Sequence, residues 1–340
     1  MKRNRLLKIS LILLPFAALY ALDLGDYSPQ NGPGAVALIA KRGQIQFHKA
    51  TGYANVEKKV KLTTTSQFNL ASVSKHMTAM AILQLIADGK ISENSKLSDL
   101  LPGLPGYTRN IQLHHLIRHT SGLPDYEDVC EESSRPLSNA DVTDFIKKTT
   151  KPDFSAGSKF AYSNTGYVLL AEIVAAKSGL AFDIYMQKFL FNKAGMKNTY
   201  VITPPRRNLY LKNSVRAYAE DWQQGEWEED PCDYISGDGG IVSTTGDMHA
   251  WFSALTSNKF ASASMMKKYF TSRIVNDEVY AFGLSGNEDD ESTFDHSGSW
   301  NGYATYVTLD IENRNWQIWL SNWESFPYGD SSEAAAEEFF

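Results

Sequence analysis

The pattern of apolar positions predicts helices through the middle of the chain and strands near both ends. The apolar residues of Ser72–Asp88 surround most of a helical cylinder, so this segment is expected to be a core helix that Gly89 ends. Further helices are predicted at Leu113–Arg118, Asn139–Lys148, Asn164–Ser178, Ala181–Lys193, Thr245–Leu255, Ser262–Phe270 and Ser331–Phe340.

Strand patterns occur on either side of this helical region. Ala35–Ile39 and Ile45–Gly52 form a predicted hairpin around Lys41–Gly43. Strand character returns at Tyr280–Leu284, Tyr303–Asp310 and Trp316–Ser321. Strands at both ends with helices between them predict an α+β fold, in which N- and C-terminal strands share one antiparallel sheet that helices flank.

This pattern predicts one domain over residues 22–340. Its sheet part would span about residues 30–70 and 275–340, and a mainly helical part of about residues 71–274 would be inserted between them. We find no internal repeat and no low-complexity linker that would divide the chain further.

The first residues have the character of a targeting segment. A basic front (Lys2, Arg3, Arg5 and Lys8) precedes the apolar stretch Ile9–Leu22, which is short for a membrane span. Residues 1–21 are therefore predicted to be a signal peptide cleaved after Ala21, which would make the protein secreted or periplasmic. An uncleaved membrane anchor is the alternative.

Charge and cysteine content narrow the choice of partners and compartment. The formal net charge of −6 argues weakly against nucleic acid or an anionic membrane surface as a partner. Cys130 and Cys232 are the only cysteines, and export would allow them to form a disulfide. Two unpaired buried thiols are the alternative, because sequence separation does not fix a Cα distance. The oligomeric state stays open.

Ser72 and Lys75 are the strongest candidates for chemistry. Three positions apart on a helix, they lie on one face, so the hydroxyl and the amine can meet. A serine hydroxyl needs a base to become a good nucleophile, and burial favours the neutral, basic form of an amine. The same spacing recurs at Ser264 and Lys267, so this motif alone is weak evidence.

The order of motifs separates one set from the others. Tyr-x-Asn occurs at Tyr53–Asn55 and at Tyr162–Asn164, and His-x-Gly occurs at His296–Gly298. Only the set that begins with Ser72–Lys75 runs in the order Ser-x-x-Lys, Tyr-x-Asn, His-x-Gly, since no Tyr-x-Asn follows Ser264–Lys267.

Together with three longer stretches, this ordered set resembles the penicillin-recognising serine hydrolases. These include class C β-lactamases, D-alanyl-D-alanine carboxypeptidases, D-amino-acid peptidases and related esterases. The stretches are Phe68–Lys75, Leu116–Tyr126 and Gly239–Met248, and the likeness extends from Ala35 to Ser321. The resemblance implies the β-lactamase-like fold.

The resemblance also implies roles for the motif residues. Ser72 would attack a carbonyl and become acylated, while Lys75 and Tyr162 share the proton transfers. Asn164 would hydrogen-bond Lys75 and the substrate amide. No metal and no cofactor is implied.

The third motif would complete the site. Backbone N–H groups of Ser72 and Ser299 would form the oxyanion hole. His296 would flank the cleft and help to hold Tyr162 or a substrate carboxylate, and substrate would contact Gly298 and Trp300.

His296 departs from the β-lactamase pattern, in which a lysine usually stands at this position. Histidine is mostly neutral near pH 7 and does not grip a carboxylate as a lysine does. This argues against strong β-lactam hydrolysis, and a histidine at this position looks more like the carboxypeptidase, D-aminopeptidase and esterase branches of the family. We therefore expect a small-molecule or peptide substrate, an ester or a peptide-like amide, which can contain D-amino acids. The alternatives are a class C-type β-lactamase or a D-alanyl-D-alanine carboxypeptidase, and a binding or sensor protein that keeps only the fold.

Simpler structural explanations exist for each candidate. Ser72 could be a helix N-cap with Lys75 pointing to solvent. Asn164 could cap a helix, with Tyr162 as a core aromatic residue. His296 could be a strand histidine that neighbouring groups satisfy.

Overall fold

The computed structural model describes residues 22–131, 133–203, 215–224, 230–271, 273–276, 278–287 and 290–340. The predicted signal peptide, residues 1–21, lies outside them. Across these described segments, no helix combines the length and the apolar character that crossing a membrane requires.

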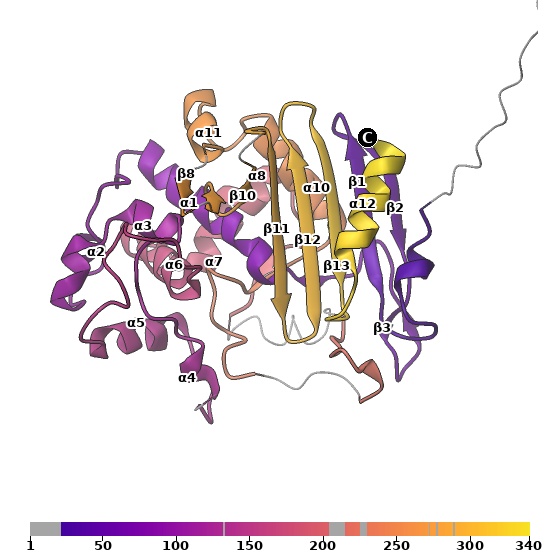
Figure 1. Ribbon diagram of the computed structural model, residues 1–340, viewed down its shortest axis with the longest axis horizontal. Coiled ribbons are helices and arrows are strands. Elements are labelled where there is room, and N and C mark those ends of the chain that lie inside the picture. The colour runs from indigo at the N-terminus through magenta and orange to yellow at the C-terminus, as the bar shows by residue number, and fades with distance from the viewer. Residues whose placement is uncertain are drawn as a thin grey trace, which may run out of the picture.

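Eight antiparallel strands form the main sheet, in the order β2-β1-β13-β12-β11-β10-β9-β8 (Figure 1). The strands are β1 (Ala35–Lys41), β2 (Gln44–Ala50), β8 (Arg273–Val275), β9 (Glu278–Tyr280), β10 (Ser285–Gly286), β11 (Thr293–Trp300), β12 (Tyr303–Asp310) and β13 (Asn315–Ser321). Ala35 of β1 lies opposite Ser321 of β13, so the two ends of the chain share one sheet. The predicted α+β fold is confirmed.

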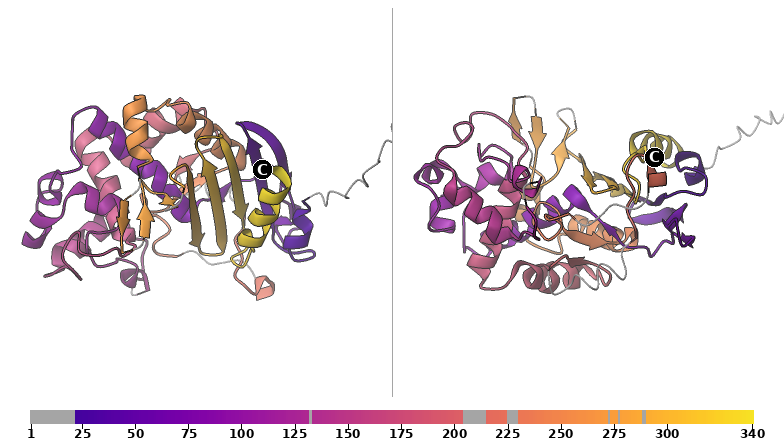
Figure 2. Two further views of the ribbon diagram at one scale, coloured as in Figure 1. Left: turned by 45° about the horizontal axis from the view of Figure 1, so that its top comes forward. Right: turned by 90° about the horizontal axis from the view of Figure 1, so that it is seen from below.

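The alternation of side chains along β1 gives the sheet two buried faces. Val36, Leu38 and Ala40 join the large core on the side of α10 (Thr245–Thr256). Ala35, Ala37 and Ile39 join a second cluster with residues of α12 (Tyr328–Phe339). Figure 2 shows α12 on the outer side of the sheet, away from the helical part of the molecule. An almost wholly apolar strand is what burial on both faces requires.

The helical region is centred on α1 (Lys75–Ala87) and α6 (Asn164–Ser178), which pack against each other. A short 3-10 turn, η2 (Ala71–Ser74), leads into α1. The other α-helices described are α2 (Leu97–Leu100), α3 (Leu113–Ile117), α4 (Asp128–Glu131), α5 (Asn139–Lys148), α7 (Phe182–Tyr185), α8 (Asn192–Ala194) and α11 (Ala263–Tyr269). Both α1 and α6 are buried around most of their circumference, as their apolar composition requires.

Two small sheets lie outside the main one. They are the pair β3 (Tyr53–Asn55) and β4 (Val60–Lys61), and the triple β5 (Phe68–Asn69), β7 (Ile241–Ser243) and β6 (Tyr200–Val201). Residues 53–69, expected in the main sheet, thus contribute to these small sheets instead. β5 leads directly into η2, so it positions the start of the helical region.

Two predicted elements are interrupted. The strand predicted at Tyr280–Leu284 is wrong, because the chain turns between β9 and β10. Gly283 has a φ of +79°, and a Cβ there would lie 2.5 Å from the Cα of His76. The segment therefore bends to pack against α1. The helix predicted at Ala181–Lys193 contains a π-helical turn, Met186–Phe191, between α7 and α8.

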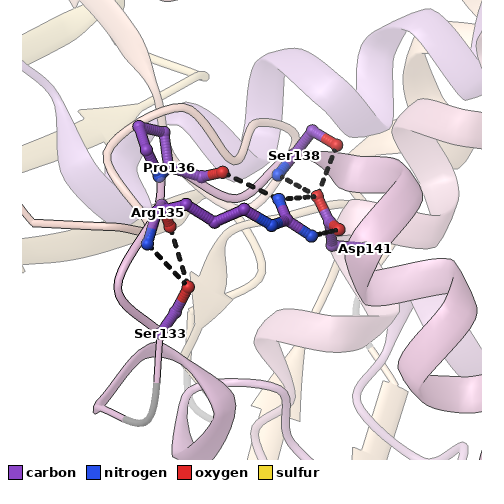
Figure 3. A network of polar contacts seen from close by, with 5 residues as sticks. All are labelled: Ser133, Arg135, Pro136, Ser138 and Asp141. Carbon is purple, nitrogen blue, oxygen red and sulfur yellow. Dashed lines mark hydrogen bonds and ion pairs between the residues drawn. The ribbon is translucent and has the colours of Figure 1, made fainter.

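The loop before α5 is held by Arg135 and Asp141 (Figure 3). Arg135 Nη2 lies 2.5 Å from Asp141 Oδ1, and both the backbone N–H and the hydroxyl of Ser138 donate to Asp141 Oδ2 at 2.8 Å. Hydrogen bonding to Arg135 holds the pKa of the Asp141 carboxyl well below its usual range. This arrangement caps α5 and fixes the direction in which its helix starts.

The same region is joined to the segment Pro231–Gly240. Cys130 and Cys232 form a disulfide across 102 positions of the sequence, which decides between the two alternatives left open above. Asn139 exchanges two hydrogen bonds with the backbone of Ser236, at 2.9 Å each. Pro231–Gly240 therefore lies fixed beside the start of α1.

Candidate functional site

Ser72 and Lys75 meet as their spacing predicts. Lys75 is completely buried, and its Nζ lies 3.0 Å from Ser72 Oγ. The simpler explanation, a lysine that points to solvent, is therefore wrong. Ser264 and Lys267, the second copy of the motif, lie exposed on α11, where Ser264 Oγ contacts only a neighbouring serine hydroxyl in the described residues.

The Lys75 amine has two further partners. Asn164 Oδ1 and the backbone carbonyl oxygen of Asp238 each accept a hydrogen bond from Nζ at 2.8 Å. Both partners can only accept, so they fix two N–H groups of the amine. The remaining position, a third N–H or the lone pair, is directed at Ser72 Oγ. In its neutral form the amine is thus placed to take the serine proton.

Asn164 is oriented by two carboxylates. Its Nδ2 donates to Glu127 Oε1 at 2.7 Å, and its backbone N–H donates to Asp125 Oδ2 at 3.0 Å. The N-cap of α6 is Ser163, whose hydroxyl accepts from the N–H of Gly166, so the capping explanation for Asn164 is wrong. The second Nδ2 hydrogen of Asn164 has no partner within the described residues, so Asn164 can direct it at a substrate.

Tyr162 lies at the surface of the site. Its side chain is 43 % exposed, so it is not a core aromatic residue. Its ring stacks on that of His119 with centroids 4.2 Å apart, and Lys75 Nζ lies 4.8 Å from the ring centroid. The Tyr162 ring is thus held between a histidine and the lysine amine.

His119 supports Tyr162 from behind. Its Nδ1 accepts the backbone N–H of Ser163 at 3.0 Å, and its φ of +55° is unusual for a residue with a Cβ. Burial, together with the nearby charge of Lys75, lowers the pKa of His119 well below 6.5, so the ring is neutral. A strained backbone at such a place is typical of a site that the surrounding fold holds in position.

Gly298 allows the sheet to approach the nucleophile. A Cβ at Gly298 would lie 2.9 Å from the backbone nitrogen of Ser72 and 2.7 Å from the carbonyl oxygen of Leu70. Among the described strands, β10 pairs with β11 only at Phe294 and Asp295. The backbone of Ser299 therefore lies beside Ser72 without a strand covering it on that side, as an oxyanion hole requires.

His296 faces the protein rather than the solvent. Its Nδ1 lies 2.5 Å from the carbonyl oxygen of Ser297, so Nδ1 carries the hydrogen, and Nε2 accepts from the Tyr280 hydroxyl at 3.0 Å. Burial, with the charge of Lys75, lowers the pKa of His296 to about 4. His296 thus presents neither a charge nor a free N–H to a substrate carboxylate, which corrects one role expected for it.

The other role expected for His296 was to hold Tyr162. The two ring centroids are 6.2 Å apart, and both imidazole nitrogens are already engaged with other partners. The described hydrogen bonds connect His296 to Tyr280 instead. The ring therefore supports the β11 wall of the site, and the simpler explanation of a satisfied strand histidine describes its contacts well.

Two hollows flank Ser72. The first, which we call the Asp238 hollow, has walls that include Ser72, Tyr126, Glu127, Asn164, Asp238 and Trp300. The second, which we call the His296 hollow, has walls that include Ser72, Tyr162, Glu278, Asp295, His296 and Gly298. All the residues predicted for the site from the sequence thus lie at or directly behind these two hollows.

Several residues of the site were not predicted. Asp125 and His119 fall within the stretch Leu116–Tyr126, and Asp238 directly precedes Gly239. Their closeness in the sequence to these motif stretches was the signal that could have identified them as site residues. Their roles depend on contacts with α1 and α6, such as that between Asp238 and Lys75, which are 163 positions apart. No local pattern in the sequence encodes such a contact.

A Gly298→Ala variant is expected to lose about 100-fold or more in the hydrolysis of an activated ester, because the new Cβ would displace β11 from Ser72 and open the oxyanion hole. Initial rates with p-nitrophenyl butanoate measure this loss. Gly329→Ala is the matched control, since a Cβ there meets no atom within 4 Å. Equal rates for the two variants would show that Gly298 does not set this approach.

His296 should make the stability of the protein depend on pH. Its folded-state pKa of about 4 lies below the ordinary 6.5, so the unfolded chain binds the proton first as pH falls. Relative to a non-titrating His296→Asn variant, wild-type protein should therefore lose stability between pH 6.5 and 4, by up to about 1.4 kcal/mol per pH unit. Urea unfolding of both proteins at several pH values measures the difference between their free energies of unfolding. A difference that stays constant between pH 6.5 and 4 would contradict the prediction.

Comparison with known proteins gives the family. A model of the Beta-lactamase family matches residues 26–338. Penicillin-binding protein 4* of Bacillus subtilis (strain 168) is 33 % identical over 320 residues, which cover 88 % of this chain and 70 % of that protein. Protein flp of Staphylococcus aureus (strain MW2) is 26 % identical, and the match covers 88 % of this chain but only 62 % of that protein.

Solved structures agree with this assignment. A penicillin-binding protein from Bacillus halodurans has a TM-score of 0.77 and 26 % identity, covering 90 % of this chain and 95 % of that chain. An octameric penicillin-binding protein homologue from Pyrococcus abyssi also has a TM-score of 0.77, at 24 % identity, covering 92 % of this chain and 74 % of that chain. The latter supports the fold alone. The chain belongs to the β-lactamase family, within the penicillin-recognising serine hydrolases that its motifs resemble.

Proposed function

We propose that this protein hydrolyses esters or peptide-like amides through an acyl-enzyme on Ser72. The observation that carries the proposal is the set of contacts made by Lys75 Nζ, which lies 3.0 Å from Ser72 Oγ while Asn164 and Asp238 hold it in place. An amine fixed beside a serine hydroxyl is an arrangement that activates the nucleophile.

The proposed reaction has two halves. Lys75 takes the proton of Ser72 as Oγ attacks the substrate carbonyl, and the backbone N–H groups of Ser72 and Ser299 stabilise the oxyanion. Tyr162 passes a proton to the leaving group, which departs and leaves the acyl group on Ser72. Water then attacks the acyl carbonyl, assisted by the same Lys75 and Tyr162 pair, and Ser72 is released.

The charged side chains that line the two hollows favour neutral or cationic substrates over carboxylates. No lysine or arginine is found among the described residues that line the two hollows, and His296 is neutral. A substrate that ends in a carboxylate, such as a penicillin or a D-alanyl-D-alanine peptide, would lack a cation to bind it there. This supports the ester or amide substrate over the β-lactamase and carboxypeptidase alternatives.

A Ser72→Ala variant tests the nucleophile. We expect it to lose p-nitrophenyl butanoate hydrolysis by about 10⁴-fold or more, since removal of a nucleophile leaves only binding and the oxyanion hole. Ser264→Ala is the matched control from the second Ser-x-x-Lys copy and should keep the wild-type rate. Full turnover by Ser72→Ala would refute the proposal.

Treatment of the same protein with penicillin separates the alternative functions. The name of the B. subtilis relative raises penicillin acylation as a second candidate activity for this site. Mass spectrometry of the protein after penicillin treatment should show no adduct on Ser72 if the proposed substrate class is right. A lasting adduct favours a carboxypeptidase, rapid turnover favours a β-lactamase, and a protein that reacts with neither ester nor penicillin is a binding or sensor protein.

We also propose that the protein is exported after cleavage near Ala21. The Cys130–Cys232 disulfide supports this, because such bonds persist in oxidising compartments. N-terminal sequencing of the protein from fractionated cells of its source should place the first residue near Leu22. Recovery from the cytoplasm with Met1 or Lys2 at its start would contradict export, and recovery of that same N-terminus in the membrane fraction would indicate an anchor.

A further inference from the structure

Asp238, which lines the Asp238 hollow, has one carboxylate oxygen to which no other described residue donates a hydrogen bond. The Asp238 side chain is only 7 % exposed, and its Oδ2 accepts a hydrogen bond from the Tyr126 hydroxyl at 2.7 Å. Its Oδ1 is buried, and no other described residue donates a hydrogen bond to it. A buried carboxylate oxygen without a donor is costly, so a donor from outside the chain would be favourable there.

The other charges in the Asp238 hollow have the same sign. Glu127 lies exposed at its wall, with Oε1 accepting from Asn164. Asp233 also lines it, but both of its oxygens are engaged: Oδ1 with Trp300 Nε1 at 2.8 Å, and Oδ2 with the backbone N–H of Asp230 at 2.9 Å. Asp238 and Glu127 are therefore the carboxylates that can attract a ligand.

The hollow lies on one defined side of the scissile bond. Tyr162, which would protonate the leaving group, lines the His296 hollow and not the Asp238 hollow. The leaving group must therefore occupy the His296 hollow. Since both hollows meet at Ser72, the acyl part of the substrate extends into the Asp238 hollow, past Asn164.

We propose that the Asp238 hollow binds a primary ammonium group carried by the acyl part of the substrate. Asp238 Oδ1 accepts a hydrogen bond from that ammonium, and Glu127 adds attraction from the rim. A charge-assisted hydrogen bond of this kind is stronger than one between neutral groups. The proposal rests on the proposed function, because it uses the same acyl-enzyme and assigns its substrate class.

The titration of Asp238 is consistent with this subsite. Burial raises the pKa of the Asp238 carboxyl, and Lys75, the Tyr126 hydroxyl and the backbone N–H of Asp238 itself oppose that rise only in part. A second cation in the hollow would stabilise the carboxylate further. Lys75 does not fill this place itself, since the described contact between the two residues is with the backbone carbonyl oxygen of Asp238.

A matched pair of esters tests the subsite. The p-nitrophenyl esters of 3-aminopropanoate and butanoate differ only in an ammonium group against a methyl group. We expect wild-type protein to prefer the ammonium ester by about tenfold or more in kcat/KM, and Asp238→Asn to lower that preference about tenfold. The asparagine can still accept from Tyr126 and keeps the backbone carbonyl for Lys75, so the fold and the amine stay in place.

Three comparisons separate the subsite from simpler effects. If Asp238 only balances the charge of Lys75, Asp238→Asn slows both esters equally and the preference survives, which would overturn the proposal. Glu127→Gln should lower the preference less than Asp238→Asn does. Glu312→Gln is the control for net charge, since Glu312 lies exposed in the turn between β12 and β13, at the far end of those strands, and should leave the preference unchanged.

The outcomes also separate this inference from the proposed function. Equal kcat/KM for the two esters in wild-type protein overturns the subsite and leaves the hydrolase intact. If neither ester reacts, the hydrolase proposal fails by itself. Calorimetric titration with 3-aminopropanamide against butanamide then decides the subsite: binding of the former alone, lost in Asp238→Asn, supports it, and equal or absent binding overturns it.

Discussion

The burial of one lysine amine is the constraint on which this site depends. Removing an amine from water is costly unless each of its hydrogen-bonding positions is satisfied. Asn164 and the carbonyl oxygen of Asp238 satisfy two positions of Lys75, and Ser72 occupies the third. These partners come from the start of α6, from the loop before β7 and from η2, so three segments must be correctly packed before the amine can be buried. The same contacts hold the Lys75 amine beside the Ser72 hydroxyl.

A second constraint is the close approach of the sheet to that base. β11 can lie against η2 only because position 298 is a glycine, and Ala71 accepts a φ of +47° in the turn that presents Ser72. The positive φ of Ala71 places backbone strain at the junction of the sheet and the helical region. At that junction, the backbone N–H groups and the Ser72 hydroxyl lie close together. A helix or a strand alone could not bring these groups together. The disulfide and the Asn139–Ser236 contacts hold the remaining wall against the same junction.

The electrostatic character of the site follows from what surrounds the amine. Burial lowers the pKa of both His119 and His296 below 6.5, so these two rings stay neutral even in mildly acidic solution. Carboxylates line both hollows, and no other described residue donates a hydrogen bond to one oxygen of Asp238. In the reaction we propose, a site of this composition favours substrates that bring no negative charge of their own. The chain thus shares its family with a penicillin-binding protein, while acidic side chains line the space beside Ser72.

The sequence by itself determined the elements whose signals are local. The bounds of α5, α6 and β12 match those predicted, since capping residues and apolar periodicity act within a few positions. The ordered motifs also identified the family and the residues that meet at Ser72. Only the tertiary structure decided the bend at Gly283, the disulfide, the orientation of His296 and the role of Asp238. Each of these depends on which distant segments pack together, and an apolar pattern records that a residue is buried but not what it is buried against.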